Sequence, residues 1–432
     1  MTIWAPRPQT TPQPIYQAIV QALAQDVRAG RLKPGDRLPT HRDLADRMGV
    51  TVGTVTRAYK VAQSRGLLRG EVGRGTYVAG GEPETLPPHA LPSPAADLID
   101  LRLNVPPYAE DPDLGEVLRE LAGRTDLAPL LWYLPAEGLL RHREAGAAWV
   151  RRAGLEAGPE DLVVCAGSQH ALTVALITVA QAGDTVLAEE LTYPGLKTLA
   201  GLLGLRLEPV ALDEEGLIPE ALEAACGRRP AKAVYLIPTL QNPTTAVMPE
   251  PRRRRVAELA RKFDLVIIED DVHRLLWPEA APPVSGFAPE RSFFIPGLSK
   301  TLAGGLRVAF MTVPGQLRAK AARNLAATIW FAPPLTVEIA ATWIGNGTAD
   351  RVIENKRREA AARQDLAAEI LGPYLTRRQP AAYHLWLELP YPWRGQQFAA
   401  ECTQAGVPVL PAEVFVVGQA PVPQAVRVSL SA

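Results

Sequence analysis

The sequence predicts a large α/β domain with a mostly parallel sheet, preceded by a small helical domain that ends in two short strands. From residue 161 onward, short apolar segments alternate with helical patterns, the order expected of βα units. Charge is also uneven, because residues 1–80 carry 12 Lys and Arg against 5 Asp and Glu, whereas the other residues carry 34 against 41. A proline-rich segment from Gly80 to Asp97 separates the two parts and predicts an extended linker.

Composition excludes several classes of protein. The 432 residues are 47% hydrophobic, enough for a large buried core. The three cysteines are far apart and show no CxxC spacing, so we expect neither a disulfide framework nor a metal site, and a reducing, cytoplasmic location. No apolar stretch approaches the roughly 20 residues of a membrane span, and the first residues lack an apolar signal core, so we expect no membrane partner.

The N-terminal domain starts with a helix that is ended by Gly30 and has one apolar stripe. The stripe contains Ile15, Ile19, Ala22, Leu23 and Val27. Thr40 can cap a second helix that turns Leu44 and Met48 inward, and Gly49 permits a tight turn. Thr51 can cap a third helix. Its inward residues are Val55, Ala58, Tyr59 and Ala62.

The opposite face of the third helix concentrates small hydroxyl groups and cations, which suit a major groove and its phosphates. Two short strands around a glycine-rich turn follow, from LLRGEVGRGTYV. Three helices and such a wing form a winged helix-turn-helix domain. The alternative is a solvated helical domain with a basic surface. The residues on this face, which we expect to contact DNA, are Gly53, Thr54, Thr56, Arg57 and Lys60.

The segment from LKPGDRLPTHRDLADRMGV to GRGTYV resembles the DNA-binding domain of the GntR family of bacterial regulators along its whole length. The resemblance implies that Arg74 and Gly75 form the wing tip. It also implies that the residues facing an operator are Arg42, Thr51, Gly53, Thr54, Thr56 and Arg57. Family members often carry Arg after the cap, where this chain has Val52. This difference predicts fewer direct base contacts and more recognition of thymine methyl groups or DNA shape.

In the larger domain, the strands DLVVC, TVLAE, AVYLI, DLVII, SFFI and VAFMT alternate with helices. A shorter βαβ pattern from Tyr383 to Leu430 predicts a second, smaller subdomain. We expect domain bounds at 1–79, 80–97 and 98–432. Within the last part, we expect a large subdomain over about 135–315 and a small one over about 98–134 and 316–432.

Four polar clusters follow predicted strands, where ligands of parallel sheets bind. Ser168 and Gln169 open a helix whose free N–H groups suit a phosphate. Asn242 follows the AVYLIP strand, and Asp270 ends a buried strand, where a carboxylate needs a cation, a protonated ring nitrogen or a metal. Lys300 lies in GLSKTLAGGLR. Taken alone, the Ser168 cluster is also compatible with an ordinary α/β turn, and Asn242 with a capping or turn asparagine.

Together the clusters meet the requirements of pyridoxal 5'-phosphate (PLP): a lysine for its Schiff base, an acid for its ring nitrogen, a donor for its phenolate oxygen, an aromatic ring, and a helix N-terminus with an arginine for its phosphate. The chain from about Leu98 resembles the fold-type I aminotransferases of the aspartate aminotransferase class. The fusion with a GntR-type domain resembles the MocR subgroup of regulators.

The resemblance implies that Lys300 is the Schiff-base (aldimine) lysine and that Asp270 pairs with the pyridine nitrogen. Asn242 would donate to the phenolate oxygen, and Tyr193 would stack on the ring. The phosphate would be held by Ser168, Gln169, Ser299 and Arg307. Arg427 in VRVSL resembles the arginine that grips an α-carboxylate. Tyr133 resembles the tyrosine that reaches the phosphate across a dimer interface.

The chain departs from that family at two positions. His273 stands where a tyrosine commonly bonds the phenolate oxygen, so we expect cofactor binding with altered lysine basicity. Gly297 replaces a phosphate-binding serine and predicts weaker cofactor retention. Among other features, we expect Cys165 to be a buried small side chain, the Arg252 to Arg255 run to be a solvated face, and His384 to pack in its strand.

These observations predict a homodimeric, PLP-binding transcription regulator. Its binding to an operator in double-stranded DNA would be modulated by an amino acid, amine or B6 vitamer that reacts at Lys300. One alternative is a working aminotransferase, converting an amino acid to a 2-oxo acid, that carries a DNA-binding domain. Another is a DNA-binding module fused to a scaffold that no longer binds PLP. The sequence leaves open whether the site turns over.

Overall fold

The structure is a computed structural model that describes Trp4 and residues 15–28, 31–33, 35–64, 67–71, 75–78, 99–375 and 377–431. The chain divides into two compact units, Met1–His89 and Ala90–Ala432, which are described separately. The expected linker from Gly80 to Asp97 lies outside the described residues, as does Arg74.

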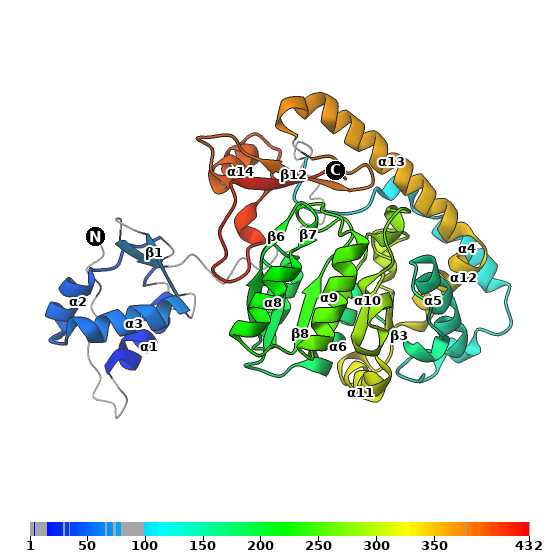
Figure 1. The fold of residues 1–432 in the computed structure, drawn as a ribbon, viewed down its shortest axis with the longest axis horizontal. Coiled ribbons are helices and arrows are strands. Elements are labelled where there is room, and N and C mark those ends of the chain that lie inside the picture. The colour runs from blue at the N-terminus through cyan, green and yellow to red at the C-terminus, as the bar shows by residue number, and fades with distance from the viewer. Residues whose placement is uncertain are drawn as a thin grey trace. The chain divides into compact units, whose positions relative to one another are not determined.

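The N-terminal unit contains three helices and a two-stranded antiparallel wing (Figure 1). Its elements are α1 (Ile15–Arg28), α2 (His41–Met48), α3 (Val52–Ser64), β1 (Leu68–Glu71) and β2 (Gly75–Val78). Thr40 caps α2 by accepting a hydrogen bond from the backbone of Asp43, and Gly49 ends the helix with a φ of 65°. All four residues expected on the inner face of α3 are buried. Ile15 was expected in the apolar stripe of α1, but it is 53% exposed and lies outside the core, whereas Val20 joins the core.

A seven-stranded sheet forms the centre of the C-terminal unit, with the strand order β3-β11-β10-β9-β8-β4-β5. The strands are β3 (Leu162–Cys165), β4 (Thr185–Glu189), β5 (Arg206–Val210), β8 (Ala233–Leu236), β9 (Val266–Asp270), β10 (Ser292–Ile295) and β11 (Ala309–Thr312). All neighbours pair in parallel except β11, which is antiparallel to β3 and β10. The expected strands and the mostly parallel sheet are confirmed. Cys165 is fully buried, as expected.

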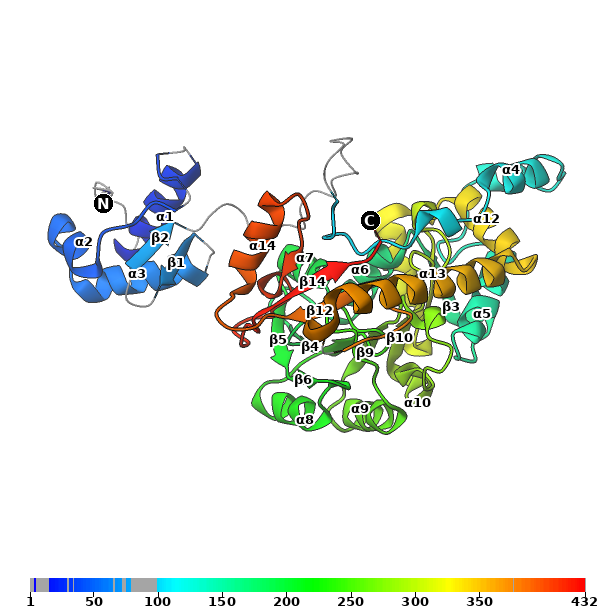
Figure 2. The ribbon, with the colours of Figure 1, turned by 90° about the horizontal axis from the view of Figure 1, so that it is seen from above.

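Helices cover both faces of this sheet (Figures 1 and 2). One face packs against α8 (Pro219–Arg228), α9 (Glu250–Lys262) and α10 (Val284–Phe287), and the other against α6 (Ser168–Val179), α7 (Pro194–Leu202) and α11 (Arg318–Ile329). A neighbouring core is formed by α4 (Leu114–Ala122), α5 (Leu140–Arg152) and α12 (Pro334–Gly345). Thus α11 and α12, which the sequence placed in the smaller subdomain, pack with the sheet. The short strands β6 (Leu212–Asp213) and β7 (Gly216–Leu217) pair with each other.

The smaller part contains a three-stranded sheet in the order β12-β14-β13. Its strands are β12 (His384–Glu388), β13 (Leu410–Pro411) and β14 (Ala425–Ser429), with α14 (Gly395–Gln404) between the first two. Both pairings are antiparallel, so the βαβ pattern expected here is not a parallel unit. The long helix α13 (Thr348–Leu371) precedes this sheet in the chain.

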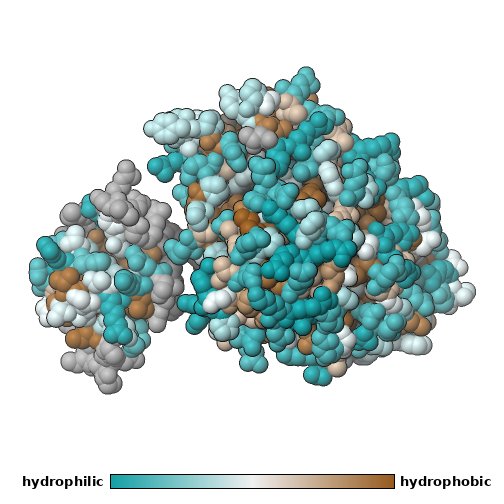
Figure 3. All heavy atoms as spheres, in the orientation of Figure 1, coloured by the Kyte–Doolittle hydropathy of each residue, from teal (hydrophilic) through white to brown (hydrophobic). Residues whose placement is uncertain are grey.

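The visible surface of the C-terminal unit is mainly hydrophilic with scattered apolar side chains (Figure 3). In the arginine run of α9, Arg252, Arg254 and Arg255 lie at the surface and pair with acids. Arg253 differs from the expectation, because it is fully buried and donates to the carbonyls of Met248 and Pro238. Across the described ranges, no helix is long and apolar enough to cross a bilayer.

Candidate functional site

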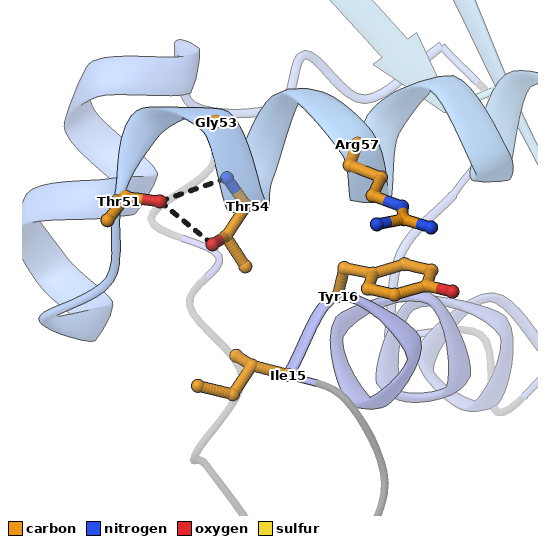
Figure 4. Close-up of a pocket in the computed structure, with 6 residues that line it drawn as sticks. All are labelled: Ile15, Tyr16, Thr51, Gly53, Thr54 and Arg57. Carbon is orange, nitrogen blue, oxygen red and sulfur yellow. Dashed lines mark hydrogen bonds between the residues drawn. The ribbon is translucent and has the colours of Figure 1, made fainter.

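The outer side of α3 presents the residues expected to contact DNA. Thr51 caps the helix by accepting a 3.2 Å hydrogen bond from the backbone N–H of Thr54, and the two hydroxyl oxygens lie 2.9 Å apart. The Arg57 guanidinium lies over the ring of Tyr16 from α1, 4.3 Å from its centroid (Figure 4). This stacking restricts the arginine before any ligand is bound, so less conformational entropy remains to be lost on binding.

The other expected DNA contacts lie in the same unit. Gly53 and Lys60 are exposed on α3, and Arg42 is exposed on α2. The hydroxyl of Thr56 is 3.2 Å from Nδ1 of His41, so this threonine also connects α3 to α2. Gly75 begins β2 with a φ of 122°. Val52 is 43% exposed, which agrees with a side chain available to contact thymine methyl groups.

In the C-terminal unit, α6 begins at the residues that were expected to hold a phosphate. Ser168 is the first helical residue, and its Oγ is buried without a hydrogen-bond partner among the described residues. Gln169 donates from Nε2 to the carbonyl of Gly195 at 3.3 Å, and its Oε1 is buried and unpartnered. A helix N-terminus that offers free N–H groups and a spare hydroxyl suits an anion.

Two glycines make this arrangement possible. A Cβ at Gly167, which has a φ of 85°, would lie 2.6 Å from Nη2 of Arg307, so glycine lets the arginine approach the helix. A Cβ at Gly297 would lie 1.9 Å from Oγ of Ser168. The serine expected at position 297 would therefore collide with the hydroxyl of Ser168, which takes that space. This finding gives a steric reason for the glycine that the sequence could not show.

Asp270 ends β9 at the C-terminal edge of the sheet and is 7% exposed. Burial raises the pKa of its carboxyl group to about 6, although a hydrogen bond from Tyr235 acts in the opposite direction. Its Oδ1 has no partner in the part of the chain that the structure describes. The neighbouring Asp271 accepts a 3.0 Å hydrogen bond from Thr239. The two acids thus differ, since Asp270 alone is positioned by the tyrosine.

Lys300 follows β10 and donates from Nζ to the backbone carbonyl of Asn104. Its pKa is lowered to about 8, first by desolvation of its ammonium group and then by the positive charge of Arg427. The hydroxyl of Tyr383 donates to the Lys300 carbonyl at 3.0 Å and fixes the backbone there. A lysine with this pKa is partly neutral near pH 7, and the neutral amine is the nucleophile.

Arg427 lies on β14 and is 5% exposed. Its Nη1 donates to Oδ1 of Asn242 at 2.9 Å, its Nη2 donates to the carbonyl of Arg102, and its Nε is buried without a partner. No ion pair joins it to a carboxylate within the described ranges. Burial lowers the pKa of this guanidinium to about 10, where it stays charged at neutral pH. Such a buried, unpaired cation is suited to a carboxylate ligand.

Two buried histidines complete the site. Both ring nitrogens of His273 lack a partner among the described residues, and burial keeps the pKa of this ring well below its usual range. His384 lies on β12 with its ring centroid 6.1 Å from that of His273. Its Nε2 donates to the Gln241 carbonyl at 3.3 Å, and its Nδ1 is 3.2 Å from the Asn104 amide nitrogen. The sequence predicts only that His384 packs in its strand. The signal that could have indicated a place in the site is a polar residue within the apolar run YHLWLEL.

The remaining residues expected at the site, Tyr193, Ser299 and Tyr133, differ in how far they are buried. Tyr193 precedes α7, and burial together with the charge of Asp270 raises the pKa of its phenol to about 12. Ser299 is adjacent to Lys300 and partly buried. Tyr133 is 82% exposed and packs beside Trp330, with ring centroids 5.1 Å apart, so it does not join the other residues within one chain.

The residues fit pyridoxal phosphate. Buried polar atoms without partners occur where its groups would need them: Ser168 Oγ beside a helix N-terminus for the phosphate, Asp270 Oδ1 for a protonated ring nitrogen, and a neutral His273 that can donate to the phenolate oxygen. The fold and this site define a class: a PLP-dependent aminotransferase fold joined to a DNA-binding unit.

Comparisons with known proteins agree. Residues 96–432 match the family "Aminotransferase class I and II", and residues 15–78 match "Bacterial regulatory proteins, gntR family". The chain is 34% identical to the uncharacterized HTH-type transcriptional regulator YdeF of Bacillus subtilis, over 99% of this chain and 93% of the relative. It is 28% identical to the HTH-type pyridoxine biosynthesis transcriptional regulator PdxR of Corynebacterium glutamicum, over 84% of this chain and 80% of that protein.

Among solved structures, the chain is similar to LysN, an α-aminoadipate aminotransferase from Thermus thermophilus, crystallised with N-(5'-phosphopyridoxyl)-L-leucine. The TM-score is 0.70 and the identity 25%, over 78% of this chain and 87% of that one. The chain belongs to the class I and II aminotransferase family and has the GntR-plus-aminotransferase architecture of MocR-type regulators. The cofactor of this family is pyridoxal phosphate.

Proposed function

We propose that this protein is a cytoplasmic transcription regulator in which PLP and an amino acid bind to the C-terminal unit and modulate binding of the N-terminal unit to an operator. The domain bounds that we propose are 1–79, 80–97 and 98–432. The observation that carries the proposal is Arg427, a buried guanidinium that has no acidic partner among the described residues. Its positive charge lowers the pKa of Lys300. Their proximity favours a ligand that carries both an amine and a carboxylate.

PLP, when bound, supplies an aldehyde that reacts reversibly with primary amines. Lys300 would attach to it, Asp270 would hold its ring nitrogen, and Asn242 and His273 would donate to its phenolate oxygen. Tyr193 would stack on its ring. Its phosphate would be held by Ser168, Gln169, Ser299 and Arg307. Arg427 would hold the carboxylate of an incoming amino acid in a bidentate pair.

We also propose a homodimer. Leu131, Trp132 and Tyr133 are 90%, 63% and 82% exposed, and Trp330, also 63% exposed, packs beside Tyr133. An exposed aromatic cluster of this kind favours a protein interface. A two-fold dimer would let Tyr133 reach the phosphate end of the partner's site and would match two operator half-sites.

The proposal is tested by measuring DNA binding with and without amino acids. A mobility-shift assay on a duplex selected in vitro should respond to at least one of the twenty standard L-amino acids or to a B6 vitamer in the wild type. It should not respond in Lys300→Ala. An equal response in both proteins would contradict sensing through Lys300.

A working aminotransferase is the second candidate, because the lowered pKa of Lys300 also suits a residue that moves protons at neutral pH. Under that alternative, single-turnover mixing with an amino acid should bleach the yellow cofactor absorbance and release a 2-oxo acid. A regulator would instead bind the amino acid with little release of oxo acid.

A further inference from the structure

Residues 99–105, called the strap, are outside any helix or strand and lie beside the small sheet. The Ile99 N–H donates to Gly406 and the Leu101 N–H to Pro408, both at 3.0 Å, and the Ser429 N–H donates to the Leu101 carbonyl at 2.9 Å. The strap directly follows residues 79–98, which the structure does not describe, and it is covalently continuous with the chain that leads to the N-terminal unit.

The strap supplies neutral acceptors to both cations of the site. Arg427 donates to the carbonyl of Arg102, and Lys300 donates to the carbonyl of Asn104. Between them, the Ser429 hydroxyl donates to the Leu103 carbonyl at 2.6 Å. The Leu101 and Leu103 carbonyls therefore accept from Ser429, while those of Arg102 and Asn104 accept from the two cations.

Side chains reinforce this position. Arg102 and Asp100 form a bidentate pair, with Nε–Oδ1 at 2.9 Å and Nη2–Oδ2 at 2.8 Å. The Asn104 amide nitrogen is 3.2 Å from Nδ1 of His384, which is held by the Gln241 carbonyl. The strap is thus shaped by its own ion pair and attached to both the small sheet and the loop that carries Asn242.

A carboxylate ligand has to compete with the strap. One N–H of Nη1 bonds to Asn242, one N–H of Nη2 bonds to Arg102, and Nε has no partner among the described residues. Nε and Nη2 form one edge of the guanidinium, so a carboxylate that binds this edge with both oxygens takes Nε together with the nitrogen that now bonds to Arg102. A charged carboxylate is a stronger acceptor for guanidinium than a neutral carbonyl. This difference in affinity allows a ligand to shift the position of the strap.

We propose that the α-carboxylate of a bound amino acid displaces the Arg102 carbonyl from Arg427, and that the released strap reports occupancy to the chain that leads to the N-terminal unit. The inference rests on the proposed function and adds how the site is coupled to the rest of the chain. An amine without a carboxylate occupies the Lys300 end and leaves the strap on Arg427.

The test is hydrogen–deuterium exchange on the full-length, PLP-loaded protein. The probes are the twenty standard amino acids, first screened for binding by calorimetry. Each one that binds is compared with the amine that lacks its α-carboxylate, for example L-alanine with ethylamine. A bound amino acid should speed exchange of the Leu101 and Ser429 amides at least severalfold, and the matched amine should not. Binding with unchanged or slower exchange overturns the strap inference alone. If no amino acid binds, the proposed function fails as well.

A variant tests the same competition without relying on hydrogen–deuterium exchange. Ser429→Ala removes the hydroxyl bond to Leu103 and weakens the docked strap. Amino-acid affinity should rise roughly threefold to tenfold, the effect of one lost hydrogen bond on the competing state. Ser292→Ala is the matched control, because it removes a buried 2.7 Å bond to the Ala288 carbonyl far from the strap. Equal affinity in the wild type and Ser429→Ala contradicts the inference.

Discussion

The hydroxyl of Tyr235 donates a 2.8 Å hydrogen bond to Oδ2 of Asp270, and both side chains are buried in neighbouring strands of the sheet. The bond holds one carboxylate oxygen and leaves the other free to accept the proton of a ring nitrogen. It also favours the ionised carboxylate, because a donor stabilises the charged form. Tyr235 is therefore a positioning residue for Asp270.

This relationship predicts a pH dependence for cofactor binding. Burial raises the pKa of Asp270 to about 6, so the carboxylate that should hold the ring nitrogen forms as the pH rises through 6. PLP affinity, measured by absorbance titration between pH 5 and 8, should increase over that range. In Tyr235→Phe the pKa of Asp270 should be higher and the midpoint should move to higher pH. Tyr59→Phe, which removes a similar buried hydroxyl bond in the other unit, should leave the midpoint unchanged.

Attachment of the cofactor should follow the ionisation of Lys300. Desolvation lowers the pKa of its ammonium group to about 8, so the neutral amine increases as the pH rises through that value. Stopped-flow absorbance should show faster attachment between pH 7 and 9. Lys300→Ala should bind PLP without the yellow absorbance of attached cofactor. A flat rate across this range would contradict the lowered pKa.

Replacement of Arg427 should weaken amino-acid binding more than amine binding. Arg427→Lys keeps the charge and loses the bidentate geometry, and loss of a buried, hydrogen-bonded charge contact typically costs about 2–5 kcal/mol. We expect L-amino acids to bind roughly 100-fold more weakly by calorimetry. Ethylamine, which lacks the carboxylate, should bind the variant and the wild type equally. A parallel loss for both ligands would indicate general damage to the site.

DNA binding should depend on the stacking of Arg57 on Tyr16. If Arg57 contacts a phosphate, Arg57→Ala should lower the slope of log K against log salt by about 1. Tyr16→Ala keeps the charge and removes the stacking surface, so affinity should fall with less change in the slope. Arg254→Ala is a matched control, since Arg254 stacks at 4.4 Å on Phe287 in the C-terminal unit. Fluorescence anisotropy on a 30-base-pair selected duplex at four salt concentrations would distinguish the variants.

Acid stability should depend on Glu338. Its burial alone would raise the pKa, but hydrogen bonds from His142 and Arg141 and their positive charges lower it from 4.5 to about 2. A depressed pKa stabilises the fold above pH 4.5 and loses that contribution as the pH falls towards 2. Glu338→Gln should lower the free energy of unfolding at pH 7 by about 2 kcal/mol after allowance for solvent screening, and much less at pH 3. Urea unfolding at pH 7 and at pH 3 would measure the two free energies. The control is Glu258→Gln, a substitution at an exposed position.

Local patterns in the sequence were sufficient for the parts of the fold that depend on local order. Apolar runs that end in polar clusters predicted β3, β4 and β8 to β11, and therefore which side chains lie at the strand ends. Contacts between distant segments were not accessible in this way. Asn104 and His384 are 280 residues apart, and no pattern near Asn104 distinguishes it. The burial of Arg253 within an arginine run likewise depends on Met248 and Pro238, which accept its hydrogen bonds.

The roles assigned to individual site residues stay predictions that the variants above test. Lys300, Asp270, Asn242 and Arg427 could be found from sequence because each follows or occupies a strand in a recognisable motif. Tyr235 could not be found in this way, because it lies inside a buried strand. In the sequence, nothing distinguishes it from any other aromatic residue of the core. Its partner becomes visible only through the parallel pairing of β8 with β9.

The close approach of Gly297 to Ser168 also has an evolutionary consequence. A side chain at 297 and the hydroxyl of Ser168 in its present position cannot coexist, because they compete for the same small volume. A lineage that gains a side chain at 297 therefore has to turn the Ser168 hydroxyl out of this volume or lose it. Across relatives, serine at 297 should accompany either a rotated hydroxyl or a smaller residue at 168.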